Sequence, residues 1–125
     1  MRVAGIMSGT SLDGIDVAVV DIPGSSWKTR VHPVAFRSAP YPTAVREAIL
    51  AVSNTNTHTA AISRLNFLLA ELYADAVRRC GAPMRTIELI GCHRDTIFHE
   101  GEPVLIAGRP VASPLQFGEG RVMAE

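Results

Sequence analysis

The sequence predicts an α/β fold in which three strands come first, two helices follow and a fourth strand comes after them. Three observations predict this order. β-Branched runs flank a glycine-rich turn near the amino terminus, a long later segment has apolar residues at helical spacing, and an apolar run beyond it ends in polar residues. The 125 residues suffice for one domain, but the order has an unfinished tail, which indicates part of a larger protein.

The first three strands are predicted from apolar runs separated by turn residues. Residues 2–6 are short and apolar, and residues 16–22 form a denser β-branched run. Between them, residues 7–15 have the Gly, Ser, Thr and Asp composition of a turn. A third strand is predicted over residues 30–38, after a loop at residues 24–28. We therefore expect an antiparallel meander at the start of the chain.

Two helices are predicted next. Thr43 is a suitable N-cap for a helix over residues 44–52. The second helix, over residues 58–80, has the stronger signal because its apolar residues step by three and four along one face. Gly81 and then Pro83 end it. The predicted apolar face consists of Ile62, Leu65, Leu69, Leu72 and Ala76.

The fourth strand is predicted over residues 86–91, and a polar segment follows it at residues 92–96. The carboxyl end of a strand is where α/β folds place ligand chemistry. From Glu100 onward the frequent glycines and prolines predict a loop, and residues 121–125 resemble the first turn of a helix.

The composition argues against several classes of partner. Twelve basic and twelve acidic residues cancel, whereas a nucleic-acid or anionic-membrane surface normally needs a basic excess. No run approaches the roughly 18 apolar residues of a membrane span, and the first strand leaves no room for a signal peptide. Two cysteines are too few for a disulfide scaffold. We therefore expect a cytoplasmic protein with free thiols; whether it forms a homodimer stays open.

The segment with the clearest chemistry is the turn near the amino terminus. Glycines at both of its ends let a ligand approach backbone N–H groups closely, and hydroxyl side chains add donors, so the turn can hold phosphate oxygens. Two flanking carboxylates, Asp13 and Asp16, could hold a hydrated Mg²⁺. The segment matches neither the Walker A nor the dinucleotide-binding glycine pattern. The phosphate-binding candidates are Gly9, Thr10, Ser11, Leu12, Asp13, Gly14, Ile15 and Asp16.

Simpler alternatives stand beside this hypothesis. A turn of this composition is more often only a connection between strands. A zinc site from Cys92, His93 and His99 is chemically conceivable, but the spacing fits no usual zinc motif and a fourth ligand is not evident. Trp27 is expected to cap the hairpin, with sugar stacking as the alternative.

Three segments carry a family resemblance. Residues 5–16, G-I-M-S-G-T-S-L-D-G-I-D, are similar to the amino-terminal signature of anhydro-N-acetylmuramic acid kinases. Residues 90–99 resemble the family's I-G-x-H-G-Q-T-[IV]-x-H block, and residues 115–120 resemble its L-Q-I-G-[DE] block. The three motifs occur in the family's order and extend over the whole chain.

The resemblance implies a ribonuclease H-like lobe of the actin-like ATPase kind, with a mixed sheet, of which residues 1–125 form the amino-terminal portion without the second lobe. It implies a cytoplasmic enzyme of peptidoglycan recycling and amino sugar metabolism that uses Mg-ATP and water to open 1,6-anhydro-N-acetylmuramic acid and phosphorylate O6. Residues 9–16 would bind the ATP phosphates. His93 and Thr96 would lie near the sugar.

Two departures from the family pattern bear on activity. The family's Gly-Gln pair is Arg94-Asp95 here, which predicts weaker sugar binding or an altered loop, unless the two side chains pair with each other. The family's catalytic Asp-Phe-Arg segment does not occur in the 125 residues, and Asp95 is a poor substitute for a base. Three hypotheses follow: a kinase whose other residues lie outside this sequence, an inactive truncated fragment, or a non-enzymatic module that binds nucleotide or sugar.

Overall fold

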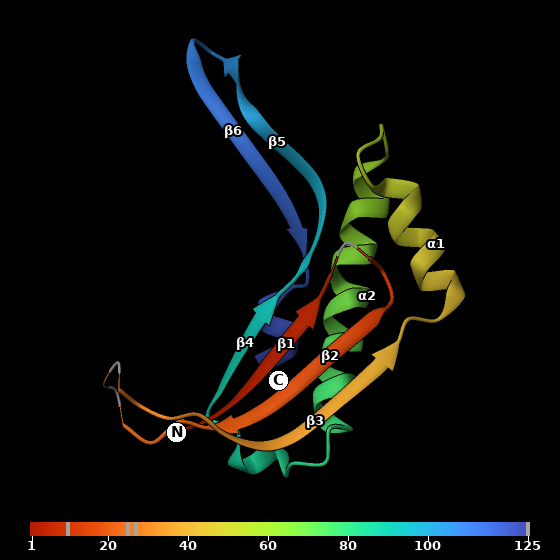
Figure 1. The fold of residues 1–125 in the computed structure, drawn as a ribbon. Helices are drawn as coiled ribbons and strands as arrows, with labels where there is room; N and C mark the ends of the chain where they lie inside the picture. The colour runs from red at the N-terminus through yellow and green to blue at the C-terminus, as the bar shows by residue number, and fades with distance from the viewer. Residues whose placement is uncertain (10, 25, 27, 125) are drawn as a thin grey trace.

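A computed structural model describes residues 1–9, 11–24, 26 and 28–124 of the chain. It is α/β, as predicted (Figure 1). The strands are β1 (Arg2–Ser8), β2 (Gly14–Asp21), β3 (His32–Pro40), β4 (Leu89–His93), β5 (Asp95–Ile106) and β6 (Arg109–Phe117). The helices are α1 (Thr43–Val52), α2 (Thr59–Arg78) and α3 (Gly120–Ala124), with a 3₁₀ turn, η1, at Met84–Thr86.

The main sheet has four strands in the order β3-β2-β1-β4. The pairs β1–β2 and β2–β3 are antiparallel, which confirms the predicted meander, and β4 pairs with β1 in parallel. The sheet is therefore mixed and is compatible with an actin-like ATPase lobe. Because β1 and β4 run in the same direction, their carboxyl ends meet at one edge, where Met7 lies opposite His93.

The core lies between the sheet and α2, which lies behind one face of it, and α1 packs beside α2 and adds buried residues to the same core (Figure 1). Alternate residues of β1, Ala4 and Ile6, are buried, whereas Met7 between Ile6 and Ser8 is exposed, as a strand with one covered face requires. The predicted face of α2 is confirmed, since Leu65, Leu69 and Ala76 are buried and Ile62 and Leu72 pack against the core. No helix in the described part of the chain is long and apolar enough to span a membrane.

Several predicted boundaries shift by a few residues. β1 and β2 continue farther toward each other than expected, so the turn between them is shorter. The fourth strand begins at Leu89, because Thr86 belongs to η1. Thr43 is wrong as the N-cap: α1 begins at Thr43 itself, the capping position is Pro42, and no side chain caps the helix. Proline suits that position because its fixed φ is compatible with a helix start.

The prediction of a loop from Glu100 onward is wrong, because residues 95–117 form the hairpin β5–β6. The turn residues Ala107 and Gly108 both have positive φ, 51° and 78°, as a tight two-residue hairpin turn requires. The strand register is irregular between Glu100 and Val104, and Gly101 and Pro103 lie within this irregular stretch, where the regular ladder of hydrogen bonds is interrupted. The hairpin extends away from the main sheet (Figure 1). Proline is tolerated here because both strands have a free edge.

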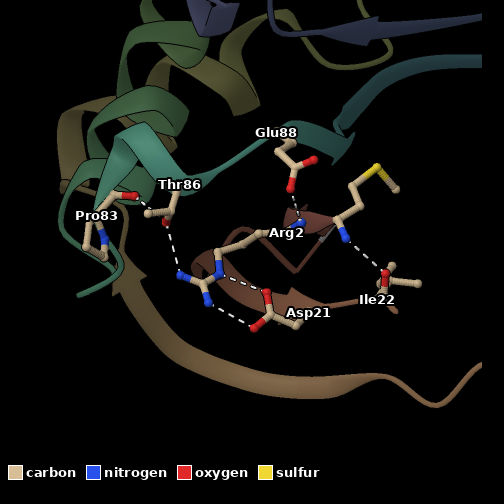
Figure 2. Close-up of polar contacts among 7 residues, drawn as sticks. Arg2, Asp21, Ile22, Pro83, Thr86 and Glu88 are labelled. Atoms are coloured by element: carbon tan, nitrogen blue, oxygen red, sulfur yellow. Dashed lines mark hydrogen bonds and ion pairs between the residues drawn. The ribbon is translucent and has the colours of Figure 1, made fainter. Parts of the chain in front are cut away.

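A polar cluster fastens the amino-terminal end of β1 (Figure 2). The Arg2 guanidinium donates two hydrogen bonds to Asp21 on β2, at 2.8 and 2.9 Å, and a third to Thr86 Oγ1 at 3.1 Å. The Arg2 amide donates to Glu88 Oε1 at 3.0 Å. One side chain thus ties β1 to its antiparallel neighbour and to the segment that leads into β4.

We expect this cluster to make stability depend on pH in the acid range. The hydrogen bond from Arg2 holds the pKa of Asp21 below its usual 3.8. A lowered folded-state pKa means that the ionised carboxylate stabilises the fold above its unfolded pKa of about 3.9, and that this contribution is lost as the pH falls through the lower folded value. Asp21→Asn should therefore unfold at a lower temperature than the unmodified chain at about pH 6. The difference between the two unfolding temperatures should disappear toward about pH 2, and a difference that does not change with pH would contradict this expectation.

Candidate functional site

The candidate phosphate loop, residues 9–16, consists of the connection from β1 to β2 and the first three residues of β2, at the sheet edge where β4 also ends. A hydrogen bond from the Leu12 amide to the Gly9 carbonyl oxygen, at 3.0 Å, closes its turn. Leu12 has a positive φ of 55°, and its side chain is buried in the core. The Leu12 side chain thereby anchors the loop to the core, while Ser11 and Asp13 on either side of Leu12 stay exposed.

A cavity of about 270 Å³ lies against this loop. Its lining contains the two carboxylates predicted for Mg²⁺, Asp13 and Asp16, both of which are exposed. Carboxylates and small residues around one hollow are a suitable environment for a cation with phosphate oxygens. The lining residues are Gly9, Ser11, Asp13, Gly14 and Asp16 from the predicted set, with Met7, Ser38 and Pro40.

The other predicted loop residues are placed differently. The side chains of Leu12 and Ile15 belong to the hydrophobic core, and neither residue lines the cavity. Thr10 lies outside the described residues, as does Trp27. The sequence pattern therefore mixes residues at the surface with residues that hold the loop in place.

Gly14 is required at its position by the neighbouring strand. A Cβ there would overlap the carbonyl oxygen of Ala39 and lie 2.9 Å from its carbonyl carbon. Both atoms belong to the backbone of β3, which cannot move without disturbing the sheet. The second glycine of the loop thus serves close packing of β2 on β3, and Gly9, whose Cβ would be 3.7 Å from Ser11 Oγ, has the open surroundings.

The two residues predicted to contact the sugar, His93 and Thr96, lie at the end of β4 and near the start of β5. His93 is exposed and lies opposite Met7, a cavity-lining residue, in the parallel register. Thr96 lies opposite Gln116 of β6, which donates from Nε2 to Thr96 Oγ1 at 3.2 Å. Neither His93 nor Thr96 lines the 270 Å³ cavity itself. The fold thus brings the first two sequence motifs to one edge of the main sheet, and the third motif contacts the second through the bond from Gln116 to Thr96.

Arg94 and Asp95 do not pair with each other, so that alternative is wrong. Arg94 donates from its guanidinium to the Gly118 carbonyl oxygen at 2.9 Å. Gly118 has a φ of 127°, and a Cβ there would lie 3.0 Å from Arg94 Cδ, so the arginine side chain passes directly over the glycine. Asp95 turns inward and is 2% exposed. A catalytic base must lie within hydrogen-bond reach of the water that it activates, and Asp95 is buried and does not line the cavity at the phosphate loop.

Asp95 lies in a cluster of hydroxyl groups that the sequence did not reveal. Its Oδ2 accepts hydrogen bonds from Ser8 at 2.7 Å, Tyr41 at 2.6 Å and Tyr73 at 2.9 Å. Burial raises the pKa of both tyrosines, and the hydrogen bonds to Asp95 raise it further. Both phenols therefore stay protonated and donate. No local pattern predicts this cluster, because its members are separated by at least 22 positions along the chain.

The zinc alternative finds no support in the geometry. Burial raises the pKa of the Cys92 thiol to about 11, which disfavours the thiolate that zinc requires. Adjacent strand residues point to opposite faces, so Cys92 and His93 face apart. In the part of the chain that the structure describes, no three His, Cys, Asp or Glu side chains are grouped as metal ligands.

Comparisons with known proteins give the family. The family model for anhydro-N-acetylmuramic acid kinase matches residues 1–125. Relatives named anhydro-N-acetylmuramic acid kinase include those of Salinibacter ruber, 42% identical over 98% of this chain, and Caldanaerobacter subterraneus, 40% identical over 98%. One from Bacillus cereus is 40% identical over 99%. The chain spans about a third of the length of these relatives, 32%, 32% and 33%. It belongs to the anhydro-N-acetylmuramic acid kinase family.

Proposed function

We propose that the cavity beside the phosphate loop binds the terminal phosphates of Mg-ATP, as part of a kinase that acts on anhydro-N-acetylmuramic acid. The observation that carries this proposal is the lining of one cavity by Asp13, Asp16 and the glycine main chain of the loop. Mg²⁺ in phosphate sites prefers one or two carboxylates with phosphate and water oxygens, and this donor set matches that preference. Family membership supports the same reading.

The loop residues have separable roles in this proposal. Gly9 leaves the backbone open to a phosphate group, and the exposed Ser11 hydroxyl donates a hydrogen bond to it. Asp13 and Asp16 hold the cation, which, when bound, neutralises charge on the phosphate oxygens. Leu12 fixes the loop from the core side. Phosphoryl transfer depends mainly on such positioning, so a loop held at both ends suits the task.

His93 and Thr96 are the residues proposed to bind the sugar that accepts the phosphoryl group. We assign them to the sugar from the family resemblance, and His93 lies opposite Met7 at the sheet edge where the phosphate loop begins. The proposed reaction opens the 1,6-anhydro ring with water and transfers phosphate to O6, in the cytoplasm, for peptidoglycan recycling and amino sugar metabolism. Asp95 is buried and is not the base, and the Asp-Phe-Arg segment of the family does not occur in these residues. The base is therefore assigned to polypeptide outside this sequence.

A binding module without transfer activity is the second candidate, because the chain covers only about a third of its relatives. A module that binds nucleotide shares Mg-ATP binding with the kinase. The two candidates differ in turnover of the anhydro sugar, which coupled detection of ADP release measures. Nucleotide binding without ADP release would favour the binding module for this chain.

The test of the cavity is a titration of the chain with Mg-ATP. Binding is measured by calorimetry or by the NMR chemical shifts of the Gly9 and Ser11 amides. We expect Asp13→Asn or Asp16→Asn to weaken binding roughly 10–100-fold, the usual cost of losing a group that orients a hydrated metal. Glu47→Gln removes an exposed carboxylate on α1, away from the cavity, and serves as the matched control. Equal affinities for all three variants and the unmodified chain would remove the two aspartates from the site.

A further inference from the structure

Asp95 is a buried carboxylate that receives hydroxyl donors from three separate parts of the fold. Ser8 ends β1, Tyr41 lies between β3 and α1, and Tyr73 lies on α2. All three bond to Oδ2. Arg94, the nearest cationic residue along the chain, is committed to the Gly118 carbonyl oxygen. The carboxylate is thus held by hydroxyl groups alone.

Such an arrangement is costly, and stability alone does not explain it. A buried carboxylate without a cationic partner depends on its hydrogen bonds for compensation. In Asp95 that compensation is partial, because Oδ1 is buried and has no partner, the one such side-chain atom among the described residues. An unsatisfied buried group in a native protein calls for a specific reason. The location of the cluster supplies one.

The bond between Ser8 Oγ and Asp95 Oδ2, at 2.7 Å, connects the two halves of the candidate site. Ser8 immediately precedes Gly9, the first residue of the phosphate loop, and Asp95 lies between His93 and Thr96. The residues are 87 positions apart in sequence. Movement of the loop relative to the sugar residues would have to break or stretch this bond.

We propose that Asp95 is a positioning residue which, through Ser8, fixes the phosphate loop relative to His93 and Thr96. It touches neither nucleotide nor sugar, and it sets the distance between the phosphoryl donor and its acceptor. Tyr41 and Tyr73 donate to the same oxygen and help to compensate its burial, but only Ser8 belongs to the strand that leads into the loop. This inference rests on the proposed function for its purpose, but the mechanical link between Asp95 and the loop is measurable without any ligand.

The experiment is a double-mutant cycle with hydrogen exchange of the Leu12 amide, which donates to the Gly9 carbonyl oxygen within the loop, measured by NMR on the free 125-residue chain. Ser8→Ala and Asp95→Ala each break the same bond, so each should speed exchange of this loop amide about tenfold, and the double variant should be no faster than either. Asp95→Asn, which keeps an acceptor oxygen, should restore slow exchange. Additive effects, or slow loop exchange in Asp95→Ala, would overturn the inference.

Two controls separate positioning from general destabilisation. Tyr73→Phe removes one donor from the same Oδ2 without touching the loop, and Ile97→Ala opens the core two residues along β5. Both should lower global stability and leave the ratio of loop to core exchange unchanged. If Asp95→Ala does not fold, Ser8→Ala against Tyr73→Phe decides the question, because each deletes a single hydroxyl. A twofold or smaller difference in loop exchange between that pair would overturn the inference.

Nucleotide binding is measured on the same variants, so that two failures can be told apart. Where the unmodified chain binds Mg-ATP, Ser8→Ala should weaken binding about tenfold and Tyr73→Phe should not. Absence of binding by the unmodified chain would count against the proposed function, and the exchange cycle would still decide the role of Asp95.

Discussion

Gly14→Ala is expected to destabilise the chain by about 1–3 kcal/mol or more and to abolish Mg-ATP binding. The added methyl group would overlap the Ala39 carbonyl oxygen and lie 2.9 Å from Pro40 Cα. β2 would have to separate from β3 at its first residue, and Asp13 and Asp16 on either side would be displaced with it. Urea unfolding followed by circular dichroism measures the first effect, and calorimetric titration measures the second.

Gly9→Ala is the matched control for this prediction. It makes the same chemical change at the other end of the loop, where the new Cβ meets only Ser11 Oγ at an ordinary 3.7 Å. Its unfolding free energy should stay within about 0.5 kcal/mol of the unmodified value. An unfolding midpoint for Gly14→Ala equal to that of Gly9→Ala would show that the strands adjust, and the steric argument would fail.

Leu69→Ala is expected to cost about 2–5 kcal/mol of stability, the usual range for emptying a fully buried leucine site. Leu69 is 0% exposed at the middle of α2, between the helix and the sheet. The effect should be severe, because the opposite face of the sheet is not covered by helices in the described residues: Phe36 is 70% exposed and Leu89 is 51% exposed. With one buried layer, the net free energy of unfolding is small, so a cavity in that layer removes a large part of it.

The neighbouring residue provides the control. Leu68→Ala makes the identical change at a side chain that is 40% exposed, so the change in stability should be about 1 kcal/mol or less. Guanidinium unfolding of both variants tests the pair. Similar losses at the two positions would mean that α2 does not pack on the sheet in the way the structure shows.

Local patterns predicted the elements whose signals are local. The step of three and four in α2 and the β-branched run of β2 need no distant partner to be recognised, and both elements are present. The hairpin β5–β6 was missed, because glycine and proline usually mark loops and a free edge that tolerates them cannot be read from the sequence. Of the residues predicted to bind phosphate, Gly9, Ser11, Asp13, Gly14 and Asp16 line one cavity, and their role as a phosphate site stays a prediction.

The sequence by itself determined the α/β class, the amphipathic helix and the glycine-bounded segment between the first two strands, since each depends on neighbouring residues and their intrinsic preferences. Only the tertiary structure decided that Leu12 and Ile15 face the core, that Gly14 is fixed by the backbone of β3, and that Arg94 and Asp95 take separate partners. The physical reason is that sheet register and burial join residues far apart in the chain, and a carboxylate such as Asp95 finds its hydrogen-bond donors only after the strands and helices have packed.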